Sequence, residues 1–186
     1  MPEAPKLNAF SYVVLTLVGE DGAGPHDIVR MMRRGAWQWR ASESQYYAEP
    51  KRLAALGLLS ARKEPGITRE RTVYELTDAG RAALRAWLRT PSGPPRIQNE
   101  PLVRALAAEY VEPEVTLAAL RPLRAQFDAS LALVAEAEEI AATLPRRERI
   151  LLIDHRLVRR VIEAHQLWLD EIEAELTHEQ ADGLGA

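Results

Sequence analysis

The side chains best equipped for chemistry in this sequence are cations and small polar groups between residues 42 and 71. They fall into two sets, the first being Ser42, Ser44, Gln45, Tyr47, Lys51 and Arg52, and the second Arg62, Lys63, Arg69 and Arg71. Hydroxyl and amide groups hydrogen-bond to the edges of DNA bases, whereas ammonium and guanidinium groups pair with phosphates. We therefore predict that both sets contact double-stranded DNA, and we assign no catalytic residue.

The sequence lacks the parts that common enzyme mechanisms require. It has no cysteine, which excludes thiol chemistry, disulfides and cysteine-based zinc sites. It also has no glycine-rich phosphate loop, no His-Glu-x-x-His motif and no Gly-x-Ser-x-Gly motif. The glutamates near 136–139 and 171–175 fall in segments rich in arginine and are typical of solvated helix faces. We predict that the protein is not an enzyme and uses no cofactor and no metal.

The charge of the chain changes sign along its length. The net charge is −3, but residues 1–90 hold 14 Lys and Arg against 10 Asp and Glu, a balance of +4, and residues 91–186 hold 10 against 17, a balance of −7. Residues 30–71 alone hold ten basic and four acidic residues. This split favours a first half that faces phosphate and a second half with another role. A random scatter of surface charge is the competing interpretation.

Neither the N-terminus nor any internal segment predicts export or membrane insertion. Residues 1–6 carry no basic region followed by a long apolar run. The longest apolar stretch, 12–18, is interrupted by Thr16 and is far shorter than the ~20 residues that span a bilayer. We therefore expect a cytoplasmic protein with no membrane partner.

Three helices are expected before residue 58, over 7–19, 25–35 and 42–57. Ser42 and Gln45 have the spacing of a capping box at the start of the third helix, and Gly57 is suited to end it. Its apolar face is predicted as Tyr46, Pro50, Leu53 and Leu56, opposite Ser44, Gln45, Ala48, Lys51 and Arg52. Pro50 removes the donor to the Tyr46 carbonyl, which predicts a bend. Trp37 and Trp39 are expected to pack between the second and third helices.

Residues 58–63 and 68–76 predict a two-stranded hairpin, with Pro65 and Gly66 placed as a type II turn requires. A further helix follows over 78–89. The order of helix, helix, capped helix, basic hairpin and helix is typical of the winged helix-turn-helix, in which the third helix enters the major groove. Cations on the hairpin then clamp a flanking phosphate or enter the minor groove.

Three motifs resemble the PadR family of transcriptional regulators. They are Ser42-Glu43-Ser44-Gln45-Tyr46-Tyr47, Lys51-Arg52-Leu53-Ala54-Ala55-Leu56-Gly57-Leu58-Leu59, and Arg71-Thr72-Val73-Tyr74-Glu75-Leu76-Thr77-Asp78-Ala79-Gly80. The resemblance covers about residues 8–89, and the later part is similar to the family only by its helical arrangement. The family resemblance implies a homodimer that represses transcription and responds to a ligand.

The second half is expected to be helical. Residues 91–95 form a linker with three prolines and a glycine, and a short helix follows over 101–111. Long helices are predicted over 114–144 and 146–176, hinged at Pro145, with Pro122 as a kink or a later start of the first. Their apolar stripes have too little first-half surface to cover them, which favours a homodimer built on 120–144 and 151–176.

The fold class is therefore predicted to be mainly α, a winged helix-turn-helix of helices plus a two-stranded hairpin wing with a C-terminal helical dimerisation region. Residues 1–90 form the DNA-binding domain, 91–178 the dimerisation and effector region, and 179–186 a flexible tail.

Aromatic and histidine side chains offer candidate ligand sites beside simpler interpretations. Trp87 and Trp168 are suited to stack on a flat aromatic effector, although tryptophan at helical spacing is also typical of core. His155 and His165 lie ten residues apart near a seam, so a metal-binding or pH-sensing pair competes with packed or solvated histidines.

We predict a repressor that binds a pseudo-palindromic operator with two third helices about one DNA turn apart, ~34 Å. A small apolar or aromatic ligand between the C-terminal helices and the wings would change the wing spacing and weaken DNA binding. The alternatives are a protein-interaction adaptor that uses the same elements without DNA, and a carrier of aromatic ligands. Only a DNA-binding protein should lose affinity for DNA steeply as the salt concentration rises. Neutralising Arg69 or Arg71 should then reduce the slope of log affinity against log salt by about one.

Overall fold

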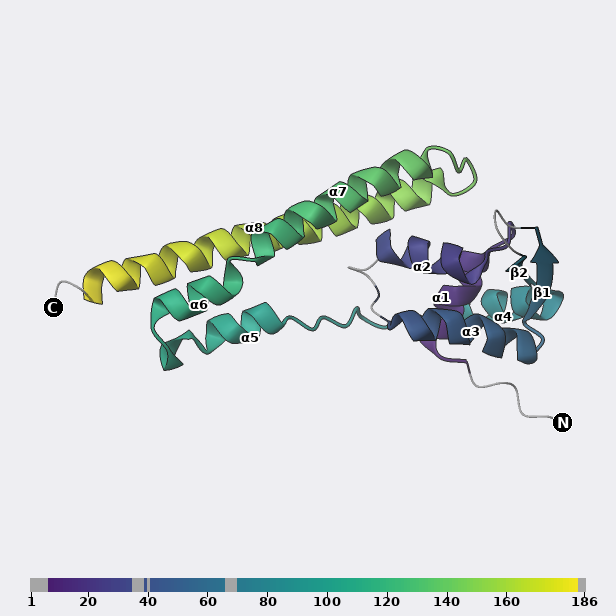
Figure 1. Cartoon of the computed structure of the whole chain (residues 1–186), viewed down its shortest axis with the longest axis horizontal. Helices are drawn as coiled ribbons and strands as arrows, with labels where there is room; N and C mark the ends of the chain where they lie inside the picture. Colours follow the sequence, from purple (N-terminus) through teal and green to yellow (C-terminus); the bar gives the residue numbers. More distant parts are fainter. Residues whose placement is uncertain (1–6, 35–38, 40, 66–69, 184–186) are drawn as a thin grey trace. The chain divides into compact units, whose positions relative to one another are not determined.

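The computed structural model describes residues 7–34, 39, 41–65 and 70–183, with side chains described as far as residue 178. The chain divides into two compact units, Met1–Pro94 and Pro95–Ala186, each with an apolar core of its own. Both units are drawn in Figure 1. The boundary between them falls inside the proline-rich segment 91–95.

The first unit has the element order that the sequence predicts. It contains α1 (Ala9–Val18), α2 (Pro25–Arg34), α3 (Glu43–Ala55), β1 (Leu59–Glu64), β2 (Arg71–Leu76) and α4 (Asp78–Trp87). Side chains cap three of the helices, because Asn8, Ser42 and Thr77 each accept a hydrogen bond from a backbone N–H of the first turn. The mainly helical fold with one hairpin is confirmed.

The hairpin pairs antiparallel and is tied to the loop before α2. Its register places Leu59 opposite Leu76 and Glu64 opposite Arg71. Ala23 adds one bridge, since its N–H and carbonyl exchange 3.0 Å hydrogen bonds with the backbone of Tyr74. This bridge fixes the hairpin against the segment that leads into α2. Residues 66–68, which include the expected turn glycine, lie outside the described residues.

The core of the first unit gathers side chains from every element. Its buried members are Val14, Leu15, Val18, Ala23, Ile28, Val29, Met32, Tyr46, Leu53, Leu58, Leu59, Tyr74 and Leu76. The expectation for Leu56 is wrong: its side chain is 38 % exposed. Leu56 is the C-cap residue of α3, and Gly57 at φ 72° then turns the chain away from the helix.

The second unit contains only helices in the residues that are described. They are α5 (Glu100–Leu106), a short 3-10 helix η1 (Ala108–Tyr110), α6 (Pro113–Leu120), α7 (Leu123–Ala141) and α8 (Glu148–Gly183). The single helix expected over 114–144 is thus two helices, because Pro122 lacks the N–H and crowds the preceding turn. Helix α8 continues past Leu176 to Gly183, so the expected tail is helical over 179–183.

Helices α7 and α8 lie side by side and antiparallel (Figure 1). The buried apolar residues between α6, α7 and α8 are Leu120, Phe127, Val134, Val158, Ile162 and Leu169. These residues belong to the stripes that we expected to pack in a dimer, and they instead cover one another within a single chain. Among the described residues, no helix is both long and apolar enough to cross a membrane.

Candidate nucleic-acid interface

The start of α3 is held by reciprocal hydrogen bonds between Ser42 and Gln45. The Gln45 backbone N–H donates to Ser42 Oγ at 3.4 Å, and the Ser42 backbone N–H donates to Gln45 Oε1 at 2.8 Å. Ser44 Oγ lies 2.9 Å from Ser42 Oγ. All three side chains are exposed. The capping box predicted from the sequence is therefore present, and it fixes the backbone of the turn that carries these polar groups.

Helix α3 has one buried and one exposed face. Tyr46 and Leu53 belong to the core, and Tyr46 packs against Phe10 with ring centroids 5.3 Å apart. Burial raises the pKa of the Tyr46 hydroxyl. Tyr47 is 37 % exposed, and Lys51 points to solvent on the same outward side of the helix. This face presents hydroxyl, amide and ammonium groups from a rigid helix.

Pro50 does not interrupt this helix. The helical segment runs from Glu43 to Ala55 without a break, and Pro50 is fully buried in the inward face. A buried proline ring contributes apolar surface to the core, which offsets part of the cost of the missing hydrogen bond.

Arg52 is bound within the fold. Its guanidinium donates to both carboxylate oxygens of Glu49, at 2.8 and 2.6 Å, and to Ser11 Oγ at 2.9 Å. Burial of Glu49 acts to raise its pKa, but the hydrogen bonds and charge of Arg52 outweigh burial, so the pKa of the carboxyl is lowered. Arg52 therefore joins α3 to α1. The sequence placed Arg52 on the face of the helix opposite the apolar residues and did not predict this role.

Two of the three predicted wing arginines, Arg62 and Arg71, are also paired with carboxylates. Arg62 lies 2.5 Å from Glu64 and 2.7 Å from Glu75, and Arg71 lies 3.0 Å from Glu64. Arg71 also reaches Asp27 in the first turn of α2, at 3.4 Å. About half of each guanidinium side chain stays exposed, 52 % for Arg62 and 54 % for Arg71.

Two predicted cations differ from these arginines. Lys51 and Lys63 are exposed, and neither makes an ion pair in the part of the chain that the structure describes. Lys63 is opposite Thr72, on the other side of the hairpin from Arg62 and Glu64. Arg69, the remaining predicted wing cation, lies outside the described residues.

Sequence reasoning missed the cations of α2. The side chains of Arg30 and Arg33 are 59 % and 73 % exposed, and Arg33 lies 3.9 Å from Glu43 at the start of α3. The first helix of a helix-turn-helix crosses the DNA backbone, which makes these arginines additional candidates for phosphate contact. Their position opposite the apolar residues Ile28 and Met32 is a signal that was present in the sequence.

A capped outward-facing helix followed by a hairpin and a closing helix occupies one continuous stretch of this chain. Residues 14–86 match the sequence model of the transcriptional regulator PadR-like family. The chain is similar to this family over these residues. The matched range runs from α1 almost to the end of α4 and contains both sets of predicted contact residues. The resemblance of the three motifs is confirmed.

One curated PadR protein is similar to about half of this PadR-like chain. The negative transcriptional regulator PadR of Bacillus subtilis is 27 % identical over 107 residues, which are 56 % of this chain and 54 % of that protein. The match thus spans about half of the curated relative.

Solved structures extend the likeness in fold to both units. The structure of Bacillus subtilis PadR with operator DNA has a TM-score of 0.73 at 21 % identity, covering 92 % of this chain and 99 % of that one. The same protein with p-coumaric acid has a TM-score of 0.64 at 21 % identity, covering 91 % and 99 %. The Vibrio cholerae virulence activator AphA has a TM-score of 0.69 at 26 % identity, covering 92 % and 99 %.

The two candidate effector tryptophans of this PadR-like protein have different surroundings. Trp87 on α4 stacks on Tyr12 of α1, with ring centroids 4.7 Å apart and planes 7° apart, and is 39 % exposed. Trp168 on α8 is partly buried against the core of the second unit. Trp168 therefore fits the interpretation as a core residue, whereas the ring of Trp87 remains accessible. Of the other pair, Trp39 packs on the first core, and Trp37 lies outside the described residues.

The histidine pair does not form one site. His165 lies 3.2 Å from Asn99 Nδ2 through Nε2 and 2.7 Å from the Val161 carbonyl through Nδ1. His155 Nδ1 is buried without a hydrogen-bond partner. In the residues that are described, no group of three or more His, Asp or Glu side chains is placed to hold a metal ion.

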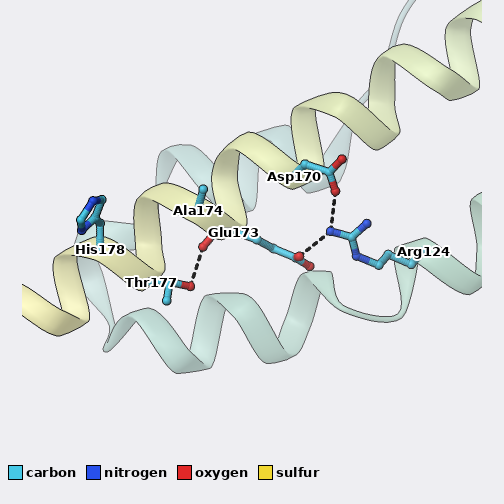
Figure 2. Close-up of a pocket in the computed structure, with 6 residues that line it drawn as sticks. All are labelled: Arg124, Asp170, Glu173, Ala174, Thr177 and His178. Atoms are coloured by element: carbon cyan, nitrogen blue, oxygen red, sulfur yellow. Dashed lines mark hydrogen bonds and ion pairs between the residues drawn. The ribbon is translucent and has the colours of Figure 1, made fainter.

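A shallow pocket on the second unit is polar. Figure 2 shows Arg124, at the start of α7, reaching toward Asp170 and Glu173 of α8. The pocket is lined by Arg124, Asp170, Glu173, Ala174, Thr177 and His178. Neither candidate tryptophan lines it, and its charged walls do not match an apolar aromatic effector.

Proposed function

We propose that this PadR-like protein is a homodimeric, sequence-specific DNA-binding transcriptional regulator. It is a repressor released by a small aromatic ligand, acts in the cytoplasm and has no catalytic role. The observation that carries the proposal is the division of α3. Its inward face is anchored by Tyr46, Pro50 and Leu53, and its outward face presents polar groups from a capped N-terminus.

A helix with this division is suited to read a major groove. The groove of B-DNA admits one α-helix, and the residues of its first turns reach the base edges. Ser44, Gln45 and Tyr47 occupy those turns, and Lys51 lies one turn further, where a phosphate contact is expected. The structure of Bacillus subtilis PadR with operator DNA supports double-stranded DNA as the ligand of this fold.

The proposed dimer uses a second apolar stripe of α8. Ile150, Ile153, Leu157 and Val161 are 63 %, 51 %, 58 % and 38 % exposed, and their spacing of three and four places them on one side of the helix. This stripe is separate from the residues that α8 buries against α6 and α7. A two-fold dimer would cover it and would present two α3 helices to successive major grooves of a pseudo-palindrome, ~34 Å apart.

The proposed effector is a small aromatic acid. The Bacillus subtilis PadR structure contains p-coumaric acid, and the exposed Trp87 ring offers a flat surface on which such a molecule would stack. A ligand releases DNA only if it binds the DNA-free state more tightly than the DNA-bound state. Titration of p-coumaric acid and related phenolic acids into the protein–DNA complex tests this. DNA affinity that no member of the series changes would remove the ligand from the proposal.

The salt dependence of DNA affinity tests the assigned contacts. Because each phosphate contact releases counterions, Lys51→Gln and Lys63→Gln are each expected to lower the slope of log affinity against log salt by roughly 0.9. The matched control is Arg85→Gln, which removes an exposed cation of α4 outside α3 and the hairpin. Slopes unchanged in both lysine variants would contradict the assignment, and an adaptor would show no salt-dependent DNA binding at all.

A further inference from the structure

A continuous ladder of six charges runs along one side of the hairpin and onto α2. Arg30 pairs with Asp27, Asp27 with Arg71, Arg71 with Glu64, Glu64 with Arg62, and Arg62 with Glu75. Three carboxylates thus alternate with three guanidiniums, so the ladder has no net charge. The sequence presented the hairpin as basic, but its fold makes two of the three predicted wing arginines, Arg62 and Arg71, part of a neutralised surface.

Glu64 joins Arg62 to Arg71 in this ladder. Arg62 contacts Oε1 at 2.5 Å, while Arg71 donates to Oε2 from Nη2 at 3.0 Å and from Nε at 3.2 Å. The hydrogen bond from Arg71 is the largest cause that lowers the pKa of the Glu64 carboxyl. The carboxylate is therefore ionised at neutral pH. It is also only 23 % exposed, since the two guanidiniums cover it on both sides.

A carboxylate in this position resembles a phosphate group. Guanidinium binds carboxylate and phosphate with the same two-pronged geometry, so the two anions compete for one set of donors. Both arginines remain half exposed and are therefore within reach of a phosphate. We propose that Glu64 is an internal competitor of DNA phosphate, which holds Arg62 and Arg71 in the free protein and restrains binding to DNA of unrelated sequence.

The restraint lowers the affinity for specific and non-specific DNA alike, but its effect on their occupancy differs. Non-specific affinity comes almost entirely from phosphate contacts, whereas a specific site adds the base contacts of α3. A carboxylate that must be displaced therefore weakens both complexes, but only the specific complex has other contacts that offset the loss. Glu64 in this way lowers the occupancy of non-specific DNA at protein concentrations that still fill the operator.

The inference rests on the proposed DNA-binding function, and Glu64→Gln tests it. The substitution keeps the shape of the side chain and removes its charge. Because one further phosphate contact becomes available, affinity for a duplex of unrelated sequence should rise on the order of fivefold to tenfold near 0.1 M salt, with a slope steeper by roughly 0.9. Glu75→Gln frees only Arg62 from one of its two partners and should give a smaller increase in the same direction.

The matched control is Glu20→Gln, which removes an ion-paired carboxylate from the same unit. Glu20 pairs with Arg81 of α4 at 2.7 Å, away from the ladder, so this variant should bind DNA as the wild type does. Circular dichroism checks that Glu64→Gln is folded. If the wild type binds duplexes and the folded Glu64→Gln variant binds them equally or more weakly, the role of Glu64 alone is overturned. Wild-type protein that binds no duplex would overturn the proposed function itself.

Discussion

Arg52 and Glu49 form a two-pronged ion pair on α3, with both carboxylate oxygens engaged at 2.8 and 2.6 Å. The same guanidinium reaches Ser11 Oγ on α1 at 2.9 Å. Glu49 is 9 % exposed and Ser11 is fully buried, so the three residues form a polar contact between two core helices. This contact fixes α3 on the scaffold that supports it.

Replacing Arg52 should therefore act on stability. Arg52→Gln leaves the Glu49 carboxylate without its partner, and a poorly exposed, unpaired anion costs about 1–3 kcal/mol. Urea denaturation measures this loss, with Lys51→Gln as a control that should change the unfolding free energy by less than about 0.5 kcal/mol. Equal stability of the two variants would show that Arg52 is a surface cation like its neighbour.

The pH dependence of stability should report on the same pair. The folded-state pKa of Glu49 is lowered below its ordinary value of 4.5. A group with a depressed folded pKa stabilises the protein above its unfolded pKa, and this contribution is lost as pH falls through the folded value. Melting temperatures measured from pH 7 down to about pH 3 should fall less steeply for Glu49→Gln than for the wild type. Parallel curves would contradict the lowered pKa.

Gly80 allows α4 to pack against the start of the hairpin. A Cβ at this position would lie 2.1 Å from the Leu58 carbonyl oxygen, a backbone atom that cannot rotate away. Gly80→Ala should therefore lose at least about 2 kcal/mol of unfolding free energy. Gly93→Ala is the matched control, because a Cβ there meets nothing within 4 Å. Wild-type stability of Gly80→Ala in a thermal melt would contradict this packing.

The proposed dimer depends on the exposed stripe of α8. Leu157→Glu places a charge in the middle of that stripe and should shift the protein to a monomer at micromolar concentration, as measured by sedimentation velocity. Arg156→Glu introduces the same carboxylate at an exposed position of α8 about 100° around the helix from Leu157 and should leave the dimer intact. A Leu157→Glu protein with the wild-type mass would place the interface elsewhere.

Local signals in the sequence predicted the first unit well. Ser42 and Gln45 act within one turn of helix, and Thr77 caps α4 by the same short-range rule, so no tertiary information was needed. The break at Pro122 was visible as a possible kink, but the choice between a bend and two helices depends on packing. Leu56 was misplaced because a helix-end residue follows the turn of the chain and not the helical period.

The pairing of charges was beyond sequence reasoning. Arg71 meets Glu64, and Glu75 meets Arg62, only in the observed strand register, and a shift of one residue would place Arg71 on the other side of the hairpin. The sequence also does not show which surface covers an apolar helix stripe. The stripe containing Phe127 and Val134 has the spacing that a dimer requires, but α8 of the same chain covers it.

Fluorescence anisotropy with duplex DNA from the protein's own upstream region tests the central claim most directly. The titration is run at two salt concentrations, with and without an excess of unrelated competitor DNA. A sequence-specific regulator should bind tightly, lose affinity sharply at the higher salt, and keep its target in the presence of competitor. Absent binding, or weak binding that the competitor abolishes, would contradict the account and favour a protein-interaction adaptor.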